Sequence, residues 1–286
     1  MKIRVATFVV WAAGFAALEL LGADDLPSKN LLVDLNVGPS LTVDDQGRVT
    51  KWLSQTEADK KFEFVGQDKG RKVVGSGLPL APKTPADGVE FAQQELVCAD
   101  EHAFDGLIRG DGCTWIVLLR PAIQQKGGLK DVNSFFGNLR NGGKYEGIWG
   151  CLDDDNTVWW GARNGLSFGR FDVNNPKVVG PKLEVGKWVV VAGRLGAGTG
   201  EVLAEIFVDK PKAVGSAKFP VNPQADASKL CVGQERDAVE HPGFESFDGA
   251  IRRFVLWNRP LTDEELGKAM NTVSQIPEAK SDVLKR

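Results

Sequence analysis

The sequence predicts an all-β protein, an antiparallel sandwich of two sheets with one short helix near the C-terminal end. Short apolar runs with strand character recur along the chain, and turn-forming residues separate them; 33 glycines and 14 prolines supply such turns. Only one segment, which begins at Thr262, carries a convincing helix start. Many strands with a single helix favour two packed sheets over an α/β fold.

The strands expected in the first half of the chain are short. Residues 42–49 read as two strands around the Asp-Asp-Gln-Gly turn. Residues 66–88 are rich in Gly, Pro and Lys, so we expect a long surface loop there. The other expected strands are apolar runs, the last of which ends at a proline: 31–35, 62–65, 89–91, 95–98 and 113–121.

The second half continues the same pattern. Residues 135–171 carry aromatic residues among glycines and fit two or three strands, joined by turns at 141–143 and 153–156. Further strands are expected at 187–193, 202–209 and 229–233.

The last strand and the helix are the clearest elements. Ile251 to Trp257 is apolar and aromatic apart from two arginines, and Pro260 cannot continue a strand ladder. Thr262 lies three residues before Glu265, which is the spacing of a capping box. Leu261 and Leu266 occupy the hydrophobic-staple positions around that cap.

Residues 247–266, with the run Trp257-Asn258-Arg259-Pro260-Leu261-Thr262, resemble the closing signature of LamG-like, concanavalin A-like lectin/glucanase domains. Residues 187–193 resemble the "W-x-x-V-A" strand of the same family, and the resemblance covers most of residues 31–272. It implies an antiparallel jelly-roll sandwich, and a binding or adhesion module more often than an enzyme. A fold does not settle function, so the sites are argued separately.

The first residues are expected to be a signal peptide, residues 1–23. Lys2 and Arg4 precede an apolar run, and Leu21-Gly22-Ala23 forms a cleavage site before Asp24. The alternative is an uncleaved anchor, but the run of about 14 apolar residues is short against the about 20 that a span needs. We therefore expect a secreted, periplasmic or cell-surface protein with no membrane span after cleavage.

One domain is expected over residues 24–275, followed by a charged tail at 276–286. The formal net charge is −3, and Lys and Arg are scattered along the chain. A nucleic-acid-binding surface needs clustered positive charge, so we expect no nucleic-acid partner.

The four cysteines are Cys98, Cys113, Cys151 and Cys231. In an exported chain they can form two disulfides by any of three pairings, of which Cys98 with Cys113 is the most local. The alternative is that they are buried free thiols, which are common in protein cores.

Motifs for catalysis are weak. Glycosidases of this fold place carboxylates on one strand face as E-x-D-x-E, whereas here Leu203 stands between Glu201 and Glu205. We expect no nucleophile elbow of the strand–G-x-S-x-G–helix kind. His102 lies beside acidic residues and reads as a surface residue rather than a general base.

The densest acidic cluster is Asp153, Asp154 and Asp155, followed by Asn156. Ca²⁺ takes oxygen ligands from such loops, and LamG-like relatives often bind one calcium at a sheet end, so Ca²⁺ is the one cofactor considered. The alternative is a plain hairpin turn, which Asp and Asn also favour.

An aromatic group is the leading candidate for ligand binding. Sugar rings have apolar C–H faces that flat aromatic rings can cover, while polar neighbours bond the hydroxyls. Adjacent strand residues face opposite ways, so we expect one tryptophan of the adjacent pair to point outward. The alternative is that all are packing residues. The candidate residues are Tyr145, Trp149, Trp159, Trp160, Arg163 and Asn164.

Together these observations predict a secreted LamG-like binding module whose partner is a glycan or another cell-surface or matrix component. Two alternatives remain open. One is a glycoside hydrolase or polysaccharide lyase on the same fold, which would need converging acids in a groove. The other is a structural or adhesion surface protein that binds protein through a sheet edge or loops.

Overall fold

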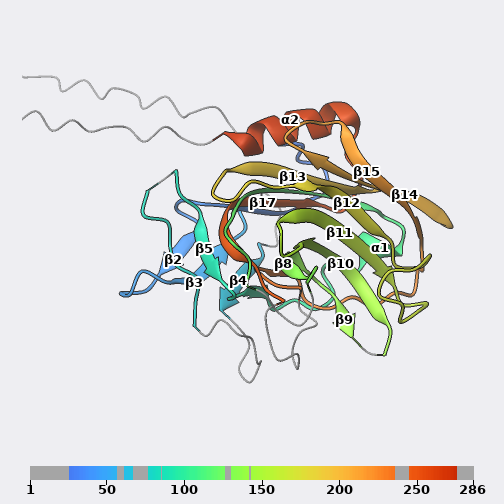
Figure 1. Cartoon of the computed structure of the whole chain (residues 1–286), viewed down its shortest axis with the longest axis horizontal. Helices are drawn as coiled ribbons and strands as arrows, with labels where there is room; N and C mark the ends of the chain where they lie inside the picture. The colour runs from blue at the N-terminus through green and yellow to red at the C-terminus, as the bar shows by residue number, and fades with distance from the viewer. Residues whose placement is uncertain are drawn as a thin grey trace, which may run out of the picture.

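The computed structural model describes residues 26–56, 61–66, 77–84, 86–125, 130–141, 143–235 and 245–275. These residues form a sandwich of two antiparallel sheets, A and B, as the sequence predicts (Figure 1). The expected signal peptide and charged tail lie outside the described residues, and so do residues 67–76 and 85 of the expected 66–88 loop. The domain limits of 24 and 275 therefore stay predictions.

Sheet A follows the order β1-β17-β7-β13-β14-β15, with β5 beside β17. Strands β7 and β17 lie at its centre and are buried almost throughout. The sheet contains strands β1 (Leu31–Asn36), β5 (Val89–Ala92), β7 (Cys113–Pro121), β13 (Val189–Leu195), β14 (Glu201–Val208), β15 (Ala213–Pro220) and β17 (Asp248–Trp257).

Sheet B follows the order β12-β11-β10-β8-β16-β6-β4-β3-β2, with β9 beside β10. Its longest strands, β10 and β11, form a hairpin (Figure 1). The sheet contains strands β2 (Leu41–Val43), β3 (Val49–Leu53), β4 (Glu63–Gly66), β6 (Leu96–Cys98), β8 (Asn133–Gly137), β9 (Arg140–Asn141), β10 (Tyr145–Leu152), β11 (Thr157–Asn164), β12 (Lys177–Lys182) and β16 (Cys231–Val232).

The main core lies between the sheets and is rich in aromatic rings. Trp115 of sheet A meets Trp160 of sheet B edge-on, with ring centroids 5.9 Å apart. Phe136 lies 4.9 Å from Trp115 and 5.1 Å from Phe254 by the same measure. Gly193 leaves the space that the Trp115 ring occupies, because a Cβ there would lie 2.4 Å from it. This interdigitation of aromatic rings joins the two sheets.

Helix α2 (Asp263–Ser274) covers the outer face of sheet A beside β13 (Figure 1). The predicted capping box is present: Glu265 N donates to Thr262 Oγ1, and Thr262 N donates to the Glu265 carboxylate. One side of the helix packs on residues such as Ile116 and Val190, in a cluster separate from the main core. The buried helix residues are Leu266, Ala269, Met270 and Val273.

Some elements differ from the sequence prediction. Strands β12 and β15 were not expected, and neither was the four-residue helix α1 (Gly106–Arg109). The region expected to hold two or three strands holds four, β8 to β11. Strand β15 lacks a clear alternation of apolar and polar residues, because most of its residues are small or exposed, which is typical of a sheet edge. Among the described residues no helix is long and apolar enough to span a membrane.

The expected disulfides are not present. All four cysteines are buried free thiols. The pairing of Cys98 with Cys113 was wrong: Cys98 in β6 of sheet B and Cys113 in β7 of sheet A are both packed in the core as free thiols. Burial raises the pKa of Cys113 to about 12. Burial, and then the nearby Glu235 carboxylate, raise the pKa of Cys151 well above its ordinary value.

Candidate functional site

The candidate tryptophans lie on the β10–β11 hairpin. Strand alternation places the adjacent pair, Trp159 and Trp160, on opposite faces of the sheet, as predicted. Trp160 pairs with Gly150 and points into the main core, where its Nε1 donates to Glu205 O at 3.0 Å. Trp159 pairs with Cys151 and points to the outer face of sheet B. Its Nε1 donates to Asp131 O at 2.8 Å.

The outward tryptophan is not exposed, which corrects the expectation of a bare ring on the sheet. Trp159 is 0% exposed, and Trp149, which meets it edge-on with centroids 4.8 Å apart, is 4% exposed. They form a small outer cluster with Val132, Leu139 and Cys151. Phe171, from the connection between β11 and β12, packs edge-on against Trp159 at 5.4 Å. The chain thus folds back over the rings that the sequence offered as a binding surface.

That connection, residues 165–176, is held in place by its own polar groups. Asn175 Nδ2 donates to Gly169 O at 2.6 Å and to Ser167 Oγ at 3.0 Å. The Asp172 carboxylate accepts from Ser167 Oγ and from the backbone N–H groups of Asn174 and Asn175. Burial acts to raise the pKa of Asp172, but these hydrogen bonds outweigh it and the pKa is lowered. These hydrogen bonds therefore fix the conformation of the segment, which can hold its side chains at defined positions.

The connection carries the exposed rings. Phe168 stacks on Tyr145 of β10, with centroids 4.7 Å apart and planes 12° apart, and remains 55% exposed. Phe171 is 37% exposed although one edge contacts Trp159. We call Tyr145, Phe168 and Phe171 the aromatic surface. The apolar side chains of Leu166 and Val173, on the same connection, are also exposed.

Arg163 of β11 packs against the Tyr145 ring of the aromatic surface. Its guanidinium carbon lies 4.7 Å from the Tyr145 ring centroid and 4.9 Å from that of Trp149. Its Nη1 donates to Gly169 O at 3.2 Å, which ties β11 to the connection. Arg163 is buried, so its role here is to position the Tyr145 ring rather than to meet solvent.

Charged side chains lie next to Phe171 of the aromatic surface. Arg170 forms an ion pair with Asp131, and its guanidinium lies 5.1 Å from the Phe171 ring centroid. Lys177 Nζ lies 4.6 Å from the Trp159 ring centroid and 3.2 Å from Asp153 Oδ1. The exposed rings therefore have both charged donors and carboxylate acceptors within one neighbourhood, which is the mixture that a polar ring ligand needs.

Asn164 does not share the surface. Its Nδ2 donates to Pro220 O at 2.7 Å, and its Oδ1 accepts from Leu166 N at 2.9 Å. It is fully buried and faces the inside of the sandwich. Strand alternation turns Asn164 away from Arg163, so it lies apart from the aromatic surface, and its bonding of a ligand hydroxyl stays a prediction.

Asp153, Asp154 and Asp155 form the β10–β11 turn, with Asn156 at φ 67°. Asp153 pairs with Lys177; burial raises its pKa, and Lys177 opposes that rise. Asp155 accepts from Thr157 N, and this hydrogen bond lowers its pKa. The Asp153 and Asp155 carboxylates have separate partners, as expected for a plain hairpin turn, which is the alternative to a calcium site. Calcium binding by these residues stays a prediction.

Within the described part of the chain, one group has metal-ligand geometry, and it comes from elsewhere: His102, Asp105 and Asp226. His102 Nδ1 lies 3.2 Å from Asp105 Oδ2, and its side chain is largely exposed, as expected for a surface residue. Arg109 lies 3.2 Å from Asp105 and 3.4 Å from Asp226, so a guanidinium already forms ion pairs with both carboxylates.

The strand carboxylates that a hydrolase would use have separate partners. Glu201 pairs with Lys218 at 2.5 Å. Glu205 pairs with Arg194 at 2.7 Å, and Arg194 also holds Asp263 of α2. Each of these carboxylates thus serves as an ion-pair partner.

The aromatic surface contains two residues that sequence reasoning missed, Phe168 and Phe171. The available signal was large apolar residues within a stretch of Gly, Ser, Asn and Asp, where no core position is expected. The structure brings together Tyr145, Trp149, Trp159 and Arg163 as predicted neighbours, and it separates Trp160 and Asn164 from them.

Comparison with known families confirms the resemblance drawn from the sequence. Residues 129–267 match the model of the family described as "Concanavalin A-like lectin/glucanases superfamily". This region includes the β10–β11 hairpin, the connection after it and the start of α2. A search of curated proteins finds no match.

Solved structures share the fold at low identity. A sialidase of Trypanosoma rangeli in complex with sialic acid aligns with a TM-score of 0.55 and 15% identity, over 88% of this chain and 34% of the sialidase. A mutant of that sialidase displaying trans-sialidase activity aligns with a TM-score of 0.51 and 14% identity, over 87% and 34%. The chain thus spans about a third of these sialidases, and the likeness shows the fold alone.

A Ruminococcus gnavus IT-sialidase CBM40 bound to α2,3-sialyllactose also matches, with a TM-score of 0.43 and 13% identity over 63% of this chain and 94% of that domain. A score this low carries no argument about the ligand of this chain.

Proposed function

We propose that this protein is a glycan-binding module and that the aromatic surface is its binding site. One observation carries the proposal: the Phe168 ring lies flat on Tyr145 and is still more than half exposed. Phe168 is not a single exposed residue, because Leu166, Phe171 and Val173 of the same connection are also exposed, and a group of exposed apolar side chains often marks a binding site. A flat ring of this kind can cover the C–H face of a sugar.

The surroundings support a sugar over a purely apolar partner. Arg170, Asp131 and Lys177 lie beside Phe171 and can bond hydroxyl groups at the edge of a stacked ring. The family to which residues 129–267 match includes lectins by its description. Secretion after removal of residues 1–23 belongs to the same proposal, because glycans are abundant outside the cell.

The test is a glycan-array screen of the protein and its Phe168→Ala variant. We expect the variant to lose about tenfold or more in affinity, equivalent to about 1.4 kcal/mol, because it lacks the flat apolar face that a sugar would cover. Its melting temperature should change little because the ring is mostly exposed. Leu203→Ala, which removes an exposed apolar side chain on β14, is the matched control and should bind as the unmodified protein does.

Two results would overturn the proposal. One is the absence of glycan binding by the unmodified protein. The other is equal binding by Phe168→Ala and Leu203→Ala. Binding of a protein partner through the same ring, without any glycan, would favour the adhesion alternative instead.

A further inference from the structure

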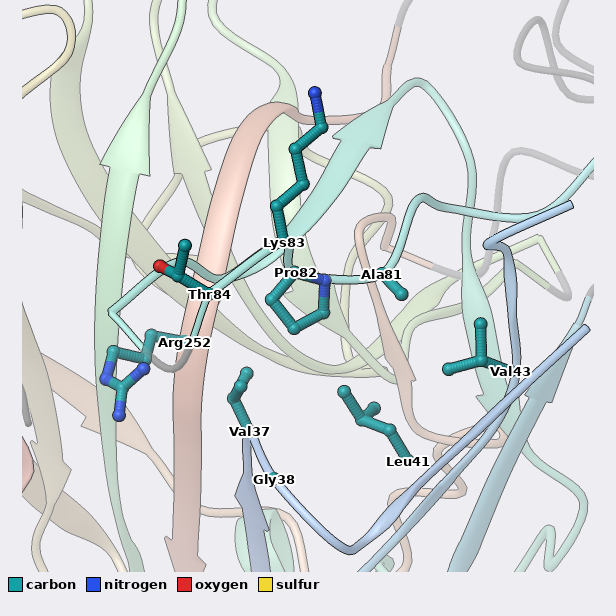
Figure 2. Close-up of a pocket in the computed structure, with 9 residues that line it drawn as sticks. All are labelled: Val37, Gly38, Leu41, Val43, Ala81, Pro82, Lys83, Thr84 and Arg252. Carbon is teal, nitrogen blue, oxygen red and sulfur yellow. The ribbon is translucent and has the colours of Figure 1, made fainter. Parts of the chain in front are cut away.

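A pocket and a charged cluster lie outside the aromatic surface. The pocket has a volume of about 350 Å³ and mainly apolar walls, with Pro82 near its centre (Figure 2). Its two cations, Lys83 and Arg252, lie at opposite ends (Figure 2). Arg252 Nη1 donates to Asp87 O at 3.1 Å, and the Asp87 charge attracts the guanidinium as well. The pocket therefore presents apolar surface that does not specify a class of ligand, whereas the charged cluster does.

The charged cluster consists of His102, Asp105 and Asp226. His102 and Asp105 lie in the turn that leads into α1, and Asp226 lies in the segment before β16. Helix α1 contacts β10 and β11 (Figure 1). His102 Nδ1 lies 3.2 Å from Asp105 Oδ2 and 4.0 Å from Asp226 Oδ1, and the three atoms all lie within 4.8 Å of one another. Zn²⁺ binds such nitrogen and oxygen atoms at about 2.0–2.2 Å, so these three atoms have the spacing of ligands around one ion.

The Asp105 carboxylate has one oxygen that lacks a partner. Asp105 is 5% exposed, and its Oδ1 has no hydrogen-bond partner among the described residues. The other oxygen of the same carboxylate, Oδ2, faces His102. A buried acceptor without a partner is unfavourable, and more so when it carries charge. A cation bound through both oxygens of Asp105 would satisfy Oδ1.

A guanidinium already lies beside these carboxylates. Arg109 Nη2 is 3.2 Å from Asp105 Oδ2 and 3.4 Å from Asp226 Oδ1. Both distances exceed the about 2.7–2.9 Å of a strong hydrogen bond between an arginine and a carboxylate. The Arg109 side chain is 35% exposed, so its end can turn towards solvent although its Nε donates to Ala225 O. An ion with a stronger hold on the two acids can therefore displace it.

The surroundings of the cluster contain more acids than cations. Arg140 pairs with Glu101 at 2.9 Å and with Asp226 at 3.4 Å. Glu146 Oε1 accepts from Asp226 N at 3.2 Å. An ion that brings two positive charges is attracted to such a place. The acids and cations of this group are Glu101, Asp105, Glu146 and Asp226 against Arg109 and Arg140.

We propose that His102, Asp105 and Asp226 bind a divalent transition-metal ion such as Zn²⁺, in competition with the Arg109 guanidinium. The imidazole nitrogen selects this class of ion, because imidazole suits Zn²⁺, Cu²⁺ and Ni²⁺ whereas Ca²⁺ and Mg²⁺ take oxygen ligands. His102 is largely exposed, so the ion can enter from solvent and keep water at its remaining positions. The site shares no residue with the aromatic surface.

The test is calorimetric titration of the full protein, free of any histidine tag and treated with chelator, with ZnCl₂ and with CaCl₂. We expect Zn²⁺ to bind more tightly than Ca²⁺. Zn²⁺ should also raise the melting temperature, since a ligand that binds only the folded state stabilises it. His102→Ala removes one of three ligands at an exposed position and should weaken Zn²⁺ binding at least about tenfold, or about 1.4 kcal/mol.

Two pairs of variants assign the ion to this cluster. Asp226→Asn should weaken Zn²⁺ binding, whereas Asp155→Asn, the same change in the exposed β10–β11 turn, is the matched control and should bind as the unmodified protein does. Arg109→Gln removes the competing guanidinium and should bind Zn²⁺ more tightly than the unmodified protein. Arg109→Lys keeps the charge and should gain less. Circular dichroism checks the fold of the Arg109 variants.

Four results would overturn the proposal. Unmodified protein that does not bind Zn²⁺, or His102→Ala that binds it equally well, would remove the ion from this cluster. A loss in Asp155→Asn as large as that in Asp226→Asn would place the ion in the turn. Equal Zn²⁺ affinities of Arg109→Gln and Arg109→Lys would show that the guanidinium does not compete. Because Phe168→Ala should keep its Zn²⁺ affinity, this proposal and the glycan proposal can fail independently.

Discussion

At the scale of single residues, the adjacent pair Trp159 and Trp160 shows how much strand alternation determines. Trp160 meets Trp115 between the sheets, while Trp159 packs on the outer face with Trp149. The faces follow from the period of two along a strand. The burial of Trp159 does not follow from that period. Phe171 packs on the ring from the 165–176 connection, and the local pattern does not predict the path of that connection.

This burial predicts that both tryptophans matter for stability. Trp160→Ala and Trp159→Ala should each lower the free energy of unfolding, by roughly 3–5 kcal/mol for a fully buried ring and less where the connection can collapse into the gap. Urea denaturation of the two variants measures this. A Trp159→Ala variant with an unchanged midpoint would contradict the packing described for the outer cluster.

At the scale of elements, helix α2 is held by its first turn. Arg259 Nη1 and Nη2 each lie 2.7 Å from the Glu265 carboxylate, which also accepts from Thr262 N. The hydrogen bond from Arg259, followed by that from Thr262, lowers the pKa of Glu265 from 4.5 to about 2. The capping box was visible in the sequence, whereas the Arg259 contact depends on the turn around Pro260.

The lowered pKa predicts a pH dependence. Glu265 stabilises the fold when it is ionised, so its contribution is present above about pH 4.5 and is lost as the pH falls towards about 2. Glu265→Gln should therefore be less stable than the unmodified protein at neutral pH, and the difference should shrink through that window. Thr262→Ala should cost about 1 kcal/mol without such a pH dependence. Parallel denaturation midpoints at all pH values for Glu265→Gln would contradict this assignment.

At the scale of the whole molecule, two sheets close over thiols that no disulfide joins. All four cysteines are buried, and at Cys113 burial raises the thiol pKa to about 12, so its thiolate is scarce at neutral pH. The thiolate is the reactive form. We expect a thiol reagent to leave the native protein unmodified and to label four cysteines after denaturation. Fewer than four labelled cysteines in a denatured, unreduced sample would indicate a disulfide and contradict the structure.

The sequence by itself determined the fold class, because period-two patterning and turn residues are local signals that survive without tertiary context. It also determined the last strand, the capping box of α2 and the opposite faces of Trp159 and Trp160. For the candidate site, it placed Tyr145 and Arg163 correctly near Trp149.

Only the tertiary structure decided which rings meet solvent. The 165–176 connection packs on Trp159 through Phe171, and Phe168 and Phe171 are the exposed rings. That Cys98 and Cys113 remain free thiols in the core was likewise visible only in the structure. The pocket beside Arg252 needs β1, β2, β17 and the 81–84 segment to converge. Exposure and convergence depend on contacts between residues far apart in the chain, and no local pattern encodes those contacts.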